Sequence, residues 1–189
     1  MISKADGVFL AALDQCAFID TLKLSIWGTR RDSPLCDVRD VKKEPIGSRR
    51  SKYAWVERGV IVGTGNRYEV VYGVLRLQKI LPTVELILRS DEKPIKMEDA
   101  EASIYNFCET VTRVIVSYAE LTFDLTGESV QWFERSIFSS ARRFTTLSDD
   151  EGRRTFYAGG PTSPWQLRVY EKTADVTRFE FALRRRFLR

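Results

Sequence analysis

Residues 155–186 decide the fold of this chain; they read TFYAGGPTSPWQLRVYEKTADVTRFEFALRRR. Apolar and polar residues alternate with period two within 155–158, 165–172 and 176–183. This alternation is typical of half-buried β-strands. The Gly159-Gly160-Pro161 cluster and residues 173–175 separate the three runs, and both have the composition of turns. The stretch therefore predicts three successive strands joined by short turns.

Strand geometry places Arg168, Tyr170 and Lys172 on one face of the middle strand. Arg178 and Glu180 share a face of the last strand. A tyrosine between two cations, next to a strand that presents a carboxylate, has the groups needed to handle a phosphodiester. A solvated sheet face with salt-bridging side chains shows the same pattern, so spacing by itself leaves both interpretations open.

The composition predicts one soluble domain with a substantial core. The chain has 189 residues, 43% of them hydrophobic and 30% charged, and a formal net charge of +4, a mild preference for polyanions. No apolar run reaches membrane-spanning length, and the first 17 residues lack a basic, signal-like start. The three cysteines, Cys16, Cys36 and Cys108, are too few and too scattered for a disulfide framework or a zinc site. We therefore expect a cytoplasmic protein in a reducing compartment, with no membrane partner.

The positive charge is concentrated in residues 28–58, which hold nine basic and five acidic residues and so account for the whole net charge. Pro34, Pro45 and Gly47 give the first part of this segment the composition of a loop. Two interpretations stay open: a solvated connection, or a basic arm that lies on DNA phosphates. The arm's proposed DNA contacts are Lys42, Lys43, Arg49 and Arg50.

The chain contains no histidine. This excludes histidine-based catalytic triads, histidine-ligated metal sites and acid–base catalysis by imidazole. Any chemistry must come from Asp, Glu, Lys, Arg, Tyr, Ser or Cys.

The remaining pattern predicts an α+β fold: a mostly antiparallel sheet with helices packed on one face. Helical spacing of apolar residues occurs at 96–112 and 130–141, and weakly at 4–17. Cys108 lies on the apolar stripe of 96–112, so we expect a core thiol. Further strands are expected at 18–27, 55–62, 68–77, 83–88, 114–125, 143–147 and 153–158. No internal repeat is evident.

Hard divalent cations such as Mg²⁺ or Mn²⁺ take carboxylate oxygens as ligands. Glu120 and Asp124 share one face of the strand expected at 114–125, but strand rise sets them roughly 13 Å apart. One of them together with Glu180 is a more natural pair. A metal there would polarise a phosphate, and Tyr170 would attack phosphorus with a phenol made more acidic by Arg168, Lys172 and the metal.

The C-terminal part of the chain resembles a known family. The residues that carry the resemblance are Thr155-Phe156-Tyr157-Ala158-Gly159, Ser163, Leu167-Arg168-Val169-Tyr170-Glu171-Lys172 and Thr177-Arg178-Phe179-Glu180. In this order they resemble the C-terminal catalytic signature of rolling-circle replication initiators of the Rep_trans type, which include plasmid initiators, phage replication initiation factors and some relaxases. Residues 118–124, YAELTFD, resemble the acidic strand of that family, with Glu120 at a position where aspartate is expected.

The resemblance implies a single Rep nuclease-like catalytic domain over residues 1–189. Tyr170 would be the nucleophile that nicks one DNA strand and becomes linked to the 5′ phosphate. Arg168, Lys172 and Arg178 would hold phosphates, and Glu120, Asp124 and Glu180 would bind Mg²⁺ or Mn²⁺. The absence of histidine separates the chain from initiators with a His-hydrophobe-His motif.

Two other functions stay open: a non-catalytic DNA-binding module on the same fold, and a small interaction domain. The expected partner is single-stranded or origin DNA. The sequence does not set the oligomeric state, and a homodimer is one possibility.

Overall fold

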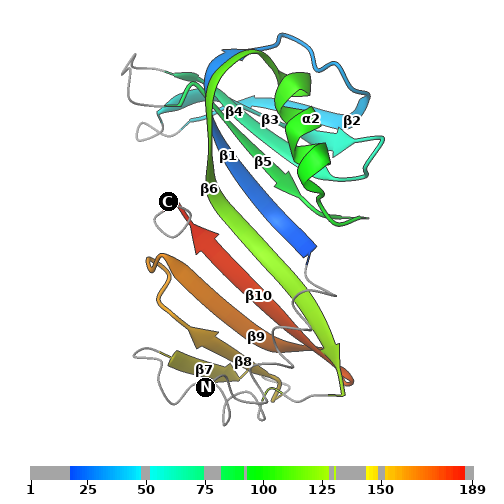
Figure 1. Ribbon diagram of the computed structural model, residues 1–189, viewed down its shortest axis with the longest axis vertical. Helices are drawn as coiled ribbons and strands as arrows, with labels where there is room; N and C mark the ends of the chain where they lie inside the picture. Colours follow the sequence, from blue (N-terminus) through cyan, green and yellow to red (C-terminus); the bar gives the residue numbers. More distant parts are fainter. Residues whose placement is uncertain are drawn as a thin grey trace. The chain divides into compact units, whose positions relative to one another are not determined.

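A computed structural model describes residues 18–47, 52–74, 82–91, 93–127, 130, 144–148 and 152–185. The chain divides into two compact units, an N-terminal unit of Ile19–Ala119 and a C-terminal unit that contains Glu120–Arg189. One long strand, β6 (Cys108–Thr126), contributes residues to both units (Figure 1).

The N-terminal unit is an antiparallel sheet with strand order β2-β3-β4-β5-β1-β6. One helix, α2 (Met97–Phe107), follows β5 in the chain. The strands before it are β1 (Phe18–Arg30), β2 (Val38–Pro45), β3 (Tyr53–Ile61), β4 (Arg67–Val74) and β5 (Val84–Arg89).

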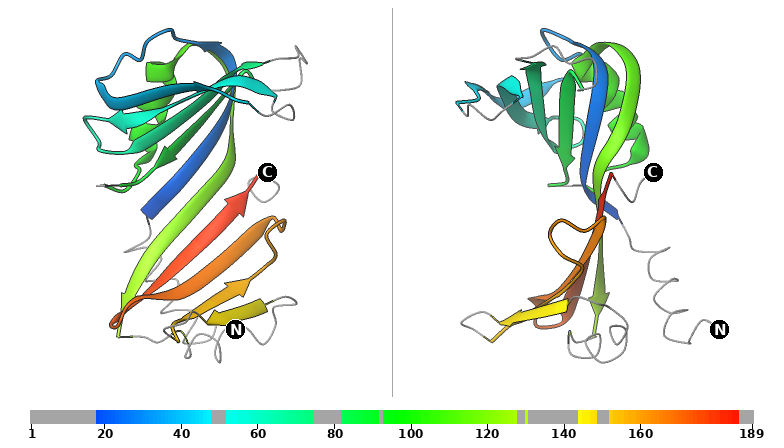
Figure 2. Two further views of the ribbon diagram at one scale, coloured as in Figure 1. Left: turned by 180° about the vertical axis from the view of Figure 1, so that it is seen from behind. Right: turned by 90° about the vertical axis from the view of Figure 1, so that its left-hand side faces the viewer.

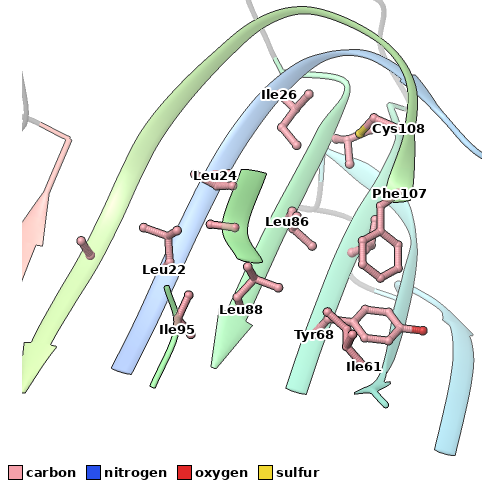
Figure 3. Packing of buried hydrophobic residues seen from close by; sticks show 14 residues of the cluster. Leu22, Leu24, Ile26, Ile61, Tyr68, Leu86, Leu88, Ile95, Phe107 and Cys108 are labelled. Atoms are coloured by element: carbon pink, nitrogen blue, oxygen red, sulfur yellow. The ribbon is translucent and has the colours of Figure 1, made fainter. Parts of the chain in front are cut away.

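The core of this unit lies between the sheet and α2. Leu22 and Leu24 of β1 are two residues apart, as are Leu86 and Leu88 of β5, so their side chains gather on one face of the sheet (Figure 3). Phe107, the last residue of α2, lies against the ring of Tyr68 with 4.5 Å between the ring centroids. The helix therefore covers the apolar face of the sheet and leaves the other face to polar side chains.

The C-terminal unit is built from β6 and a four-stranded meander, with strand order β6-β10-β9-β8-β7 (Figure 2). The meander consists of β7 (Phe144–Ser148), β8 (Arg154–Ala158), β9 (Trp165–Thr173) and β10 (Val176–Arg184). Its apolar face holds Phe123, Phe156, Val169 and Phe179, each 0% exposed. The alternating residues of β9 and β10 therefore lie on the opposite face, which carries the charged groups.

The predicted α+β fold class is wrong. The described residues form ten antiparallel strands and one helix, so this part of the chain is mainly antiparallel β-sheet. The helical spacing of residues 96–112 continues only to Phe107, and β6 takes over at Cys108, where the chain pairs along the sheet. The helices expected at 4–17 and 130–141 lie outside the described residues, apart from Val130.

Within the described residues the expected strands are confirmed, including β3 and β4 on either side of residues 62–66 and the last three strands, β8 to β10. Residues 75–77 and 143 of the expected strands lie outside the described residues. Residues 28–50 do not form only a loop, because Val38–Pro45 pairs with β3 as strand β2. The sequence hides this strand, since the register shifts between Arg39 and Lys42, and Asp40 takes a positive φ of 56°. Arg49 and Arg50 lie outside the described residues.

Cys108 is a core thiol as expected, 1% exposed, and burial raises its pKa to about 11. It is the first residue of β6 and does not belong to the helix. Among the described residues, no helix is both long and apolar enough to cross a membrane.

Candidate active site

The pairing of β8, β9 and β10 brings the charged residues of the C-terminal unit onto one face. Arg168 lies opposite Glu180, and Tyr170 lies opposite Arg178. On the other side of β9, Tyr157 of β8 pairs with Arg168. Because facing residues of an antiparallel pair project to the same side of a sheet, these side chains are neighbours.

Glu180 is the centre of the first cluster. Its carboxylate Oε1 accepts a 2.6 Å hydrogen bond from the hydroxyl of Tyr170, and its Oε2 accepts hydrogen bonds from the guanidinium of Arg168. The Glu180 side chain is only 8% exposed, whereas that of Arg168 is 42% exposed. The guanidinium carbon of Arg168 also lies 5.1 Å from the centroid of the Tyr170 ring. A buried carboxylate thus links the tyrosine to a solvent-accessible cation.

Asp124 of β6 is the centre of the second cluster. Arg178 binds it through two hydrogen bonds, Nε to Oδ1 at 2.7 Å and a terminal nitrogen to Oδ2 at 2.9 Å. The ammonium of Lys172 lies 3.0 Å from Oδ2. These hydrogen bonds, led by the one from Arg178, lower the pKa of Asp124 and raise the pKa of Arg178.

The expectation of an acidic phenol at Tyr170 is wrong for this arrangement. Burial raises the pKa of Tyr170 to about 12, and the hydrogen bond to Glu180 and its negative charge act in the same direction. Arg168 and Arg178 lower it by less. The sequence shows the flanking cations, but it does not show that a carboxylate from the next strand binds the hydroxyl.

The three acids expected to hold a metal ion are not gathered around one point. Within the part of the chain that the structure describes, no three Asp, Glu or Cys side chains lie close enough to hold a metal ion. Asp124 and Glu180 are each bound by cations. Burial acts to lower the pKa of Arg168, but the charge and hydrogen bond of Glu180, with smaller contributions from Tyr170 and Glu120, raise it. In this arrangement the three residues do not fit a metal ion, and metal binding stays a prediction.

One solved structure resembles the chain over most of its length. It is a rolling circle replication initiator protein from Geobacillus stearothermophilus. The chain has the fold of a replication initiator. The TM-score is 0.55 and the sequence identity 14%, and the match covers 89% of this chain and 74% of the other. No family model and no curated protein matches.

Two further residues belong to this charged face of the C-terminal unit, although their sequence pattern does not single them out. The alternating neighbours of Tyr157 on its own strand are Thr155 and Gly159, and cross-strand pairing puts it next to Arg168. Thr122 lies between Glu120 and Asp124 on β6, is 0% exposed, and its hydroxyl has no hydrogen-bond partner among the described residues. The position of Tyr157 follows only from the register between β8 and β9, and that of Thr122 stands out only because its hydroxyl is buried.

The proposed DNA contacts Lys42 and Lys43 belong to the N-terminal unit, on β2. The Lys43 ammonium lies 5.4 Å from the ring centroid of Trp55 and 5.6 Å from that of Tyr72. Their contact with DNA stays a prediction.

Proposed function

We propose that this protein is a replication initiator that nicks and rejoins a DNA strand, with Tyr170 as nucleophile. The observation that carries the proposal is the hydroxyl of Tyr170, which donates a hydrogen bond to a buried carboxylate on a sheet face with three cations. The fold that presents this face resembles that of the Geobacillus stearothermophilus initiator.

In the cleavage step, the Tyr170 oxygen attacks a DNA phosphorus. An O–P bond forms to Tyr170, the bond from phosphorus to the 3′ oxygen breaks, and the 5′ phosphate stays on the protein. The phenolic proton passes along the existing hydrogen bond to Glu180, and the leaving 3′ oxygen takes a proton from water. In the reverse direction a 3′ hydroxyl attacks the phosphotyrosine, releases the Tyr170 oxygen and seals the strand. The phosphotyrosine bond thus conserves the energy of the cleaved DNA phosphodiester bond.

DNA itself changes the electrostatics of this face. A phosphate competes with the carboxylates for Arg168, Arg178 and Lys172, since all three are at least partly exposed. When Arg168 turns to a phosphate, Glu180 loses its cation and becomes a stronger base for the Tyr170 proton. The cations that neutralise the carboxylates in the free protein thus stabilise the charge on phosphorus during the reaction.

The effect of a divalent cation on cleavage is part of the test of this proposal. A bound Mg²⁺ or Mn²⁺ would supply charge stabilisation for the phosphate oxygens. Because Asp124 and Glu180 are held by basic side chains, an ion can reach them only when those side chains move. The cleavage and rejoining steps do not depend on the ion. Cleavage is therefore measured with Mg²⁺, with Mn²⁺ and with EDTA.

Replacement of Tyr170 tests the nucleophile directly. Tyr170→Phe removes one hydroxyl, and we expect it to abolish both strand cleavage and the covalent protein–DNA adduct on a denaturing gel, while binding to single-stranded oligonucleotides persists. Tyr157→Phe is the matched control, since Tyr157 is on the same face beside Arg168. An adduct that survives Tyr170→Phe and disappears with Tyr157→Phe would transfer the role to Tyr157.

A second candidate function is a DNA-binding module without turnover. The raised pKa of Tyr170 and the fully paired carboxylates favour it, because both describe a face without an activated nucleophile. Wild-type protein that binds single-stranded DNA and forms no adduct under any of the three metal conditions would establish this function in place of the first.

A further inference from the structure

The two units of the chain have the same topology. In the N-terminal unit the meander β2-β3-β4-β5 ends beside β1, the strand that precedes it. In the C-terminal unit the meander β7-β8-β9-β10 ends beside β6, the strand that precedes it. Each unit is thus one strand followed by a four-stranded antiparallel meander whose last strand returns to the first (Figure 1).

The strand registers align the units residue by residue. The last strands match when Glu85 is placed on Glu180, since residues 83–89 read TVELILR and residues 178–184 read RFEFALR. The pairings then place Val70 on Leu167, both core residues. The first strands agree too, with LSI at 24–26 and LTF at 121–123. The two units therefore share their strand order and also a few residues at corresponding positions.

The aligned glutamates have the same environment. Glu85 and Glu180 are 8% and 7% exposed, and each carboxylate is bound by basic side chains and lies beside a tyrosine hydroxyl, that of Tyr53 or of Tyr170. The basic partners of Glu85 are the ammonium groups of Lys23, at 2.8 Å, and of Lys52, at 3.0 Å. Continuation of the register puts Gly73 at the position of Tyr170, with φ of 74°, a conformation that a tyrosine rarely adopts. The N-terminal unit thus keeps the buried carboxylate but has no tyrosine at the position of Tyr170. The tyrosine beside Glu85 is Tyr53, which is 3% exposed and whose hydroxyl also donates a 3.0 Å hydrogen bond to the carbonyl oxygen of Pro82.

Cations exceed carboxylates around Glu85. Lys23 and Lys52 share this one acid, with side chains 34% and 44% exposed. Nearby on β1, Trp27 has the guanidinium carbon of Arg113 at 5.0 Å from its ring centroid. Helix α2 packs on the other face of the sheet, against Leu22, Leu24 and their neighbours, and leaves the face of Lys23 uncovered by the helix.

We propose that the N-terminal unit is a non-cleaving copy of the catalytic unit, and that its face around Glu85 binds single-stranded DNA. Lys23 and Lys52 bind backbone phosphates, Arg113 adds a third cation, and Trp27 stacks on a base. The charge balance favours this occupant: two lysines share the single carboxylate of Glu85, whereas on the catalytic face three cations share the carboxylates of Asp124 and Glu180. The inference rests on the proposed function, because it assigns a DNA strand to the same protein.

The test uses the full chain in the Tyr170→Phe background, so that cleavage does not disturb binding. Affinity for fluorescein-labelled oligothymidylate is measured by anisotropy in EDTA over a range of salt concentrations. The variant Lys23→Gln/Lys52→Gln/Glu85→Gln removes the two cations without leaving a buried, unpaired carboxylate. We expect weaker binding and a salt slope flatter by about 1.4 units, from about 0.7 per phosphate contact on a single strand.

Trp27→Leu separates stacking from charge. We expect affinity to fall about tenfold with an unchanged salt slope, because stacking on a base involves no counterion release. The control is Lys93→Gln/Lys96→Gln, which removes two exposed lysines just before α2, and it should leave the slope as in the parent.

Three results would overturn the inference. If the triple variant and Trp27→Leu bind with parental affinity and slope, the face does not hold DNA, and the proposed function stands. If the triple variant alters only the oligomeric state in sedimentation, the face is an interface between copies. If the parent itself binds no oligonucleotide, the proposed function fails, and this inference fails with it.

Discussion

At the scale of single residues, Glu180 sets the state of Tyr170. The carboxylate accepts the phenolic hydrogen bond at 2.6 Å, and burial together with this carboxylate raises the pKa of Tyr170 to about 12. A phenol is a poor nucleophile until its proton leaves. The residue that makes deprotonation unfavourable in the free protein is therefore also the one placed to accept the proton.

This double role predicts the pH dependence of Glu180→Gln. An amide removes the negative charge that raises the pKa of Tyr170, so we expect that pKa to fall and the phenolate to form at lower pH. The amide is also no base, so cleavage near neutral pH should fall by about a hundredfold or more. Activity should then rise with pH towards the lowered pKa of Tyr170, measured as the initial rate of adduct formation.

Glu171→Gln is the matched control, since Glu171 neighbours Tyr170 on β9 and alternation sends it to the opposite face. Its rate profile should follow wild type. A Glu180→Gln variant with wild-type rates at neutral pH would show that the proton leaves by another route.

At the scale of elements, β1 and β6 come into close backbone contact at a glycine. A Cβ atom on Gly28 would lie 1.9 Å from the carbonyl oxygen of Thr110, and both atoms belong to the N-terminal unit. The Gly28 amide also donates a 2.9 Å hydrogen bond to the hydroxyl of Thr83. The carbonyl of Thr110 is backbone and cannot move aside like the end of a flexible side chain, so only glycine fits.

We therefore expect Gly28→Ala to destabilise the protein by about 3 kcal/mol, at the upper end of the cost of overpacking. The free energy of unfolding from urea denaturation gives the measurement. Gly63→Ala is the comparison, because nothing lies within 4 Å of a Cβ atom at Gly63. Equal midpoints for the two variants would contradict the close approach of the strands.

At the scale of the whole molecule, each unit has a partly buried carboxylate with a depressed pKa. In the N-terminal unit burial acts to raise the pKa of Glu85, but hydrogen bonds from Lys23 and Lys52 hold it below its ordinary 4.5. In the C-terminal unit Arg178 and Lys172 hold the pKa of Asp124 below 3.8. A depressed pKa contributes stability above the ordinary value, and this contribution is lost as pH falls through the folded value.

Both units should therefore lose stability in acid. We expect the melting temperature of wild type to be steady above about pH 5 and to fall below the ordinary carboxyl values. Asp124→Asn should melt lower at pH 7, because Arg178 and Lys172 lose their partner, and should lose less on acidification. Parallel melting curves for wild type and Asp124→Asn between pH 5 and pH 3 would contradict a linked role for Asp124.

The sequence by itself determined the strands and their faces. Period-two alternation placed Arg168 and Tyr170 on the polar side of β9, because neighbouring residues of a strand must project to opposite sides. It also identified Cys108 as a core residue. It misjudged the fold class and missed β2, since helical spacing at 96–112 and prolines at 34 and 45 are local signals that long-range strand pairing overrode.

Only the tertiary structure decided which groups meet. The hydrogen bond of Tyr170 to Glu180, the pairing of Tyr157 with Arg168 and the two arginine- and lysine-bound carboxylates depend on the register between strands. The repeat of the two units is likewise visible only in the tertiary structure. Corresponding buried positions of the two units share size and polarity, but few of them have the same residue. A local pattern fixes the face of a side chain, whereas its partner comes from a strand whose register that pattern does not contain.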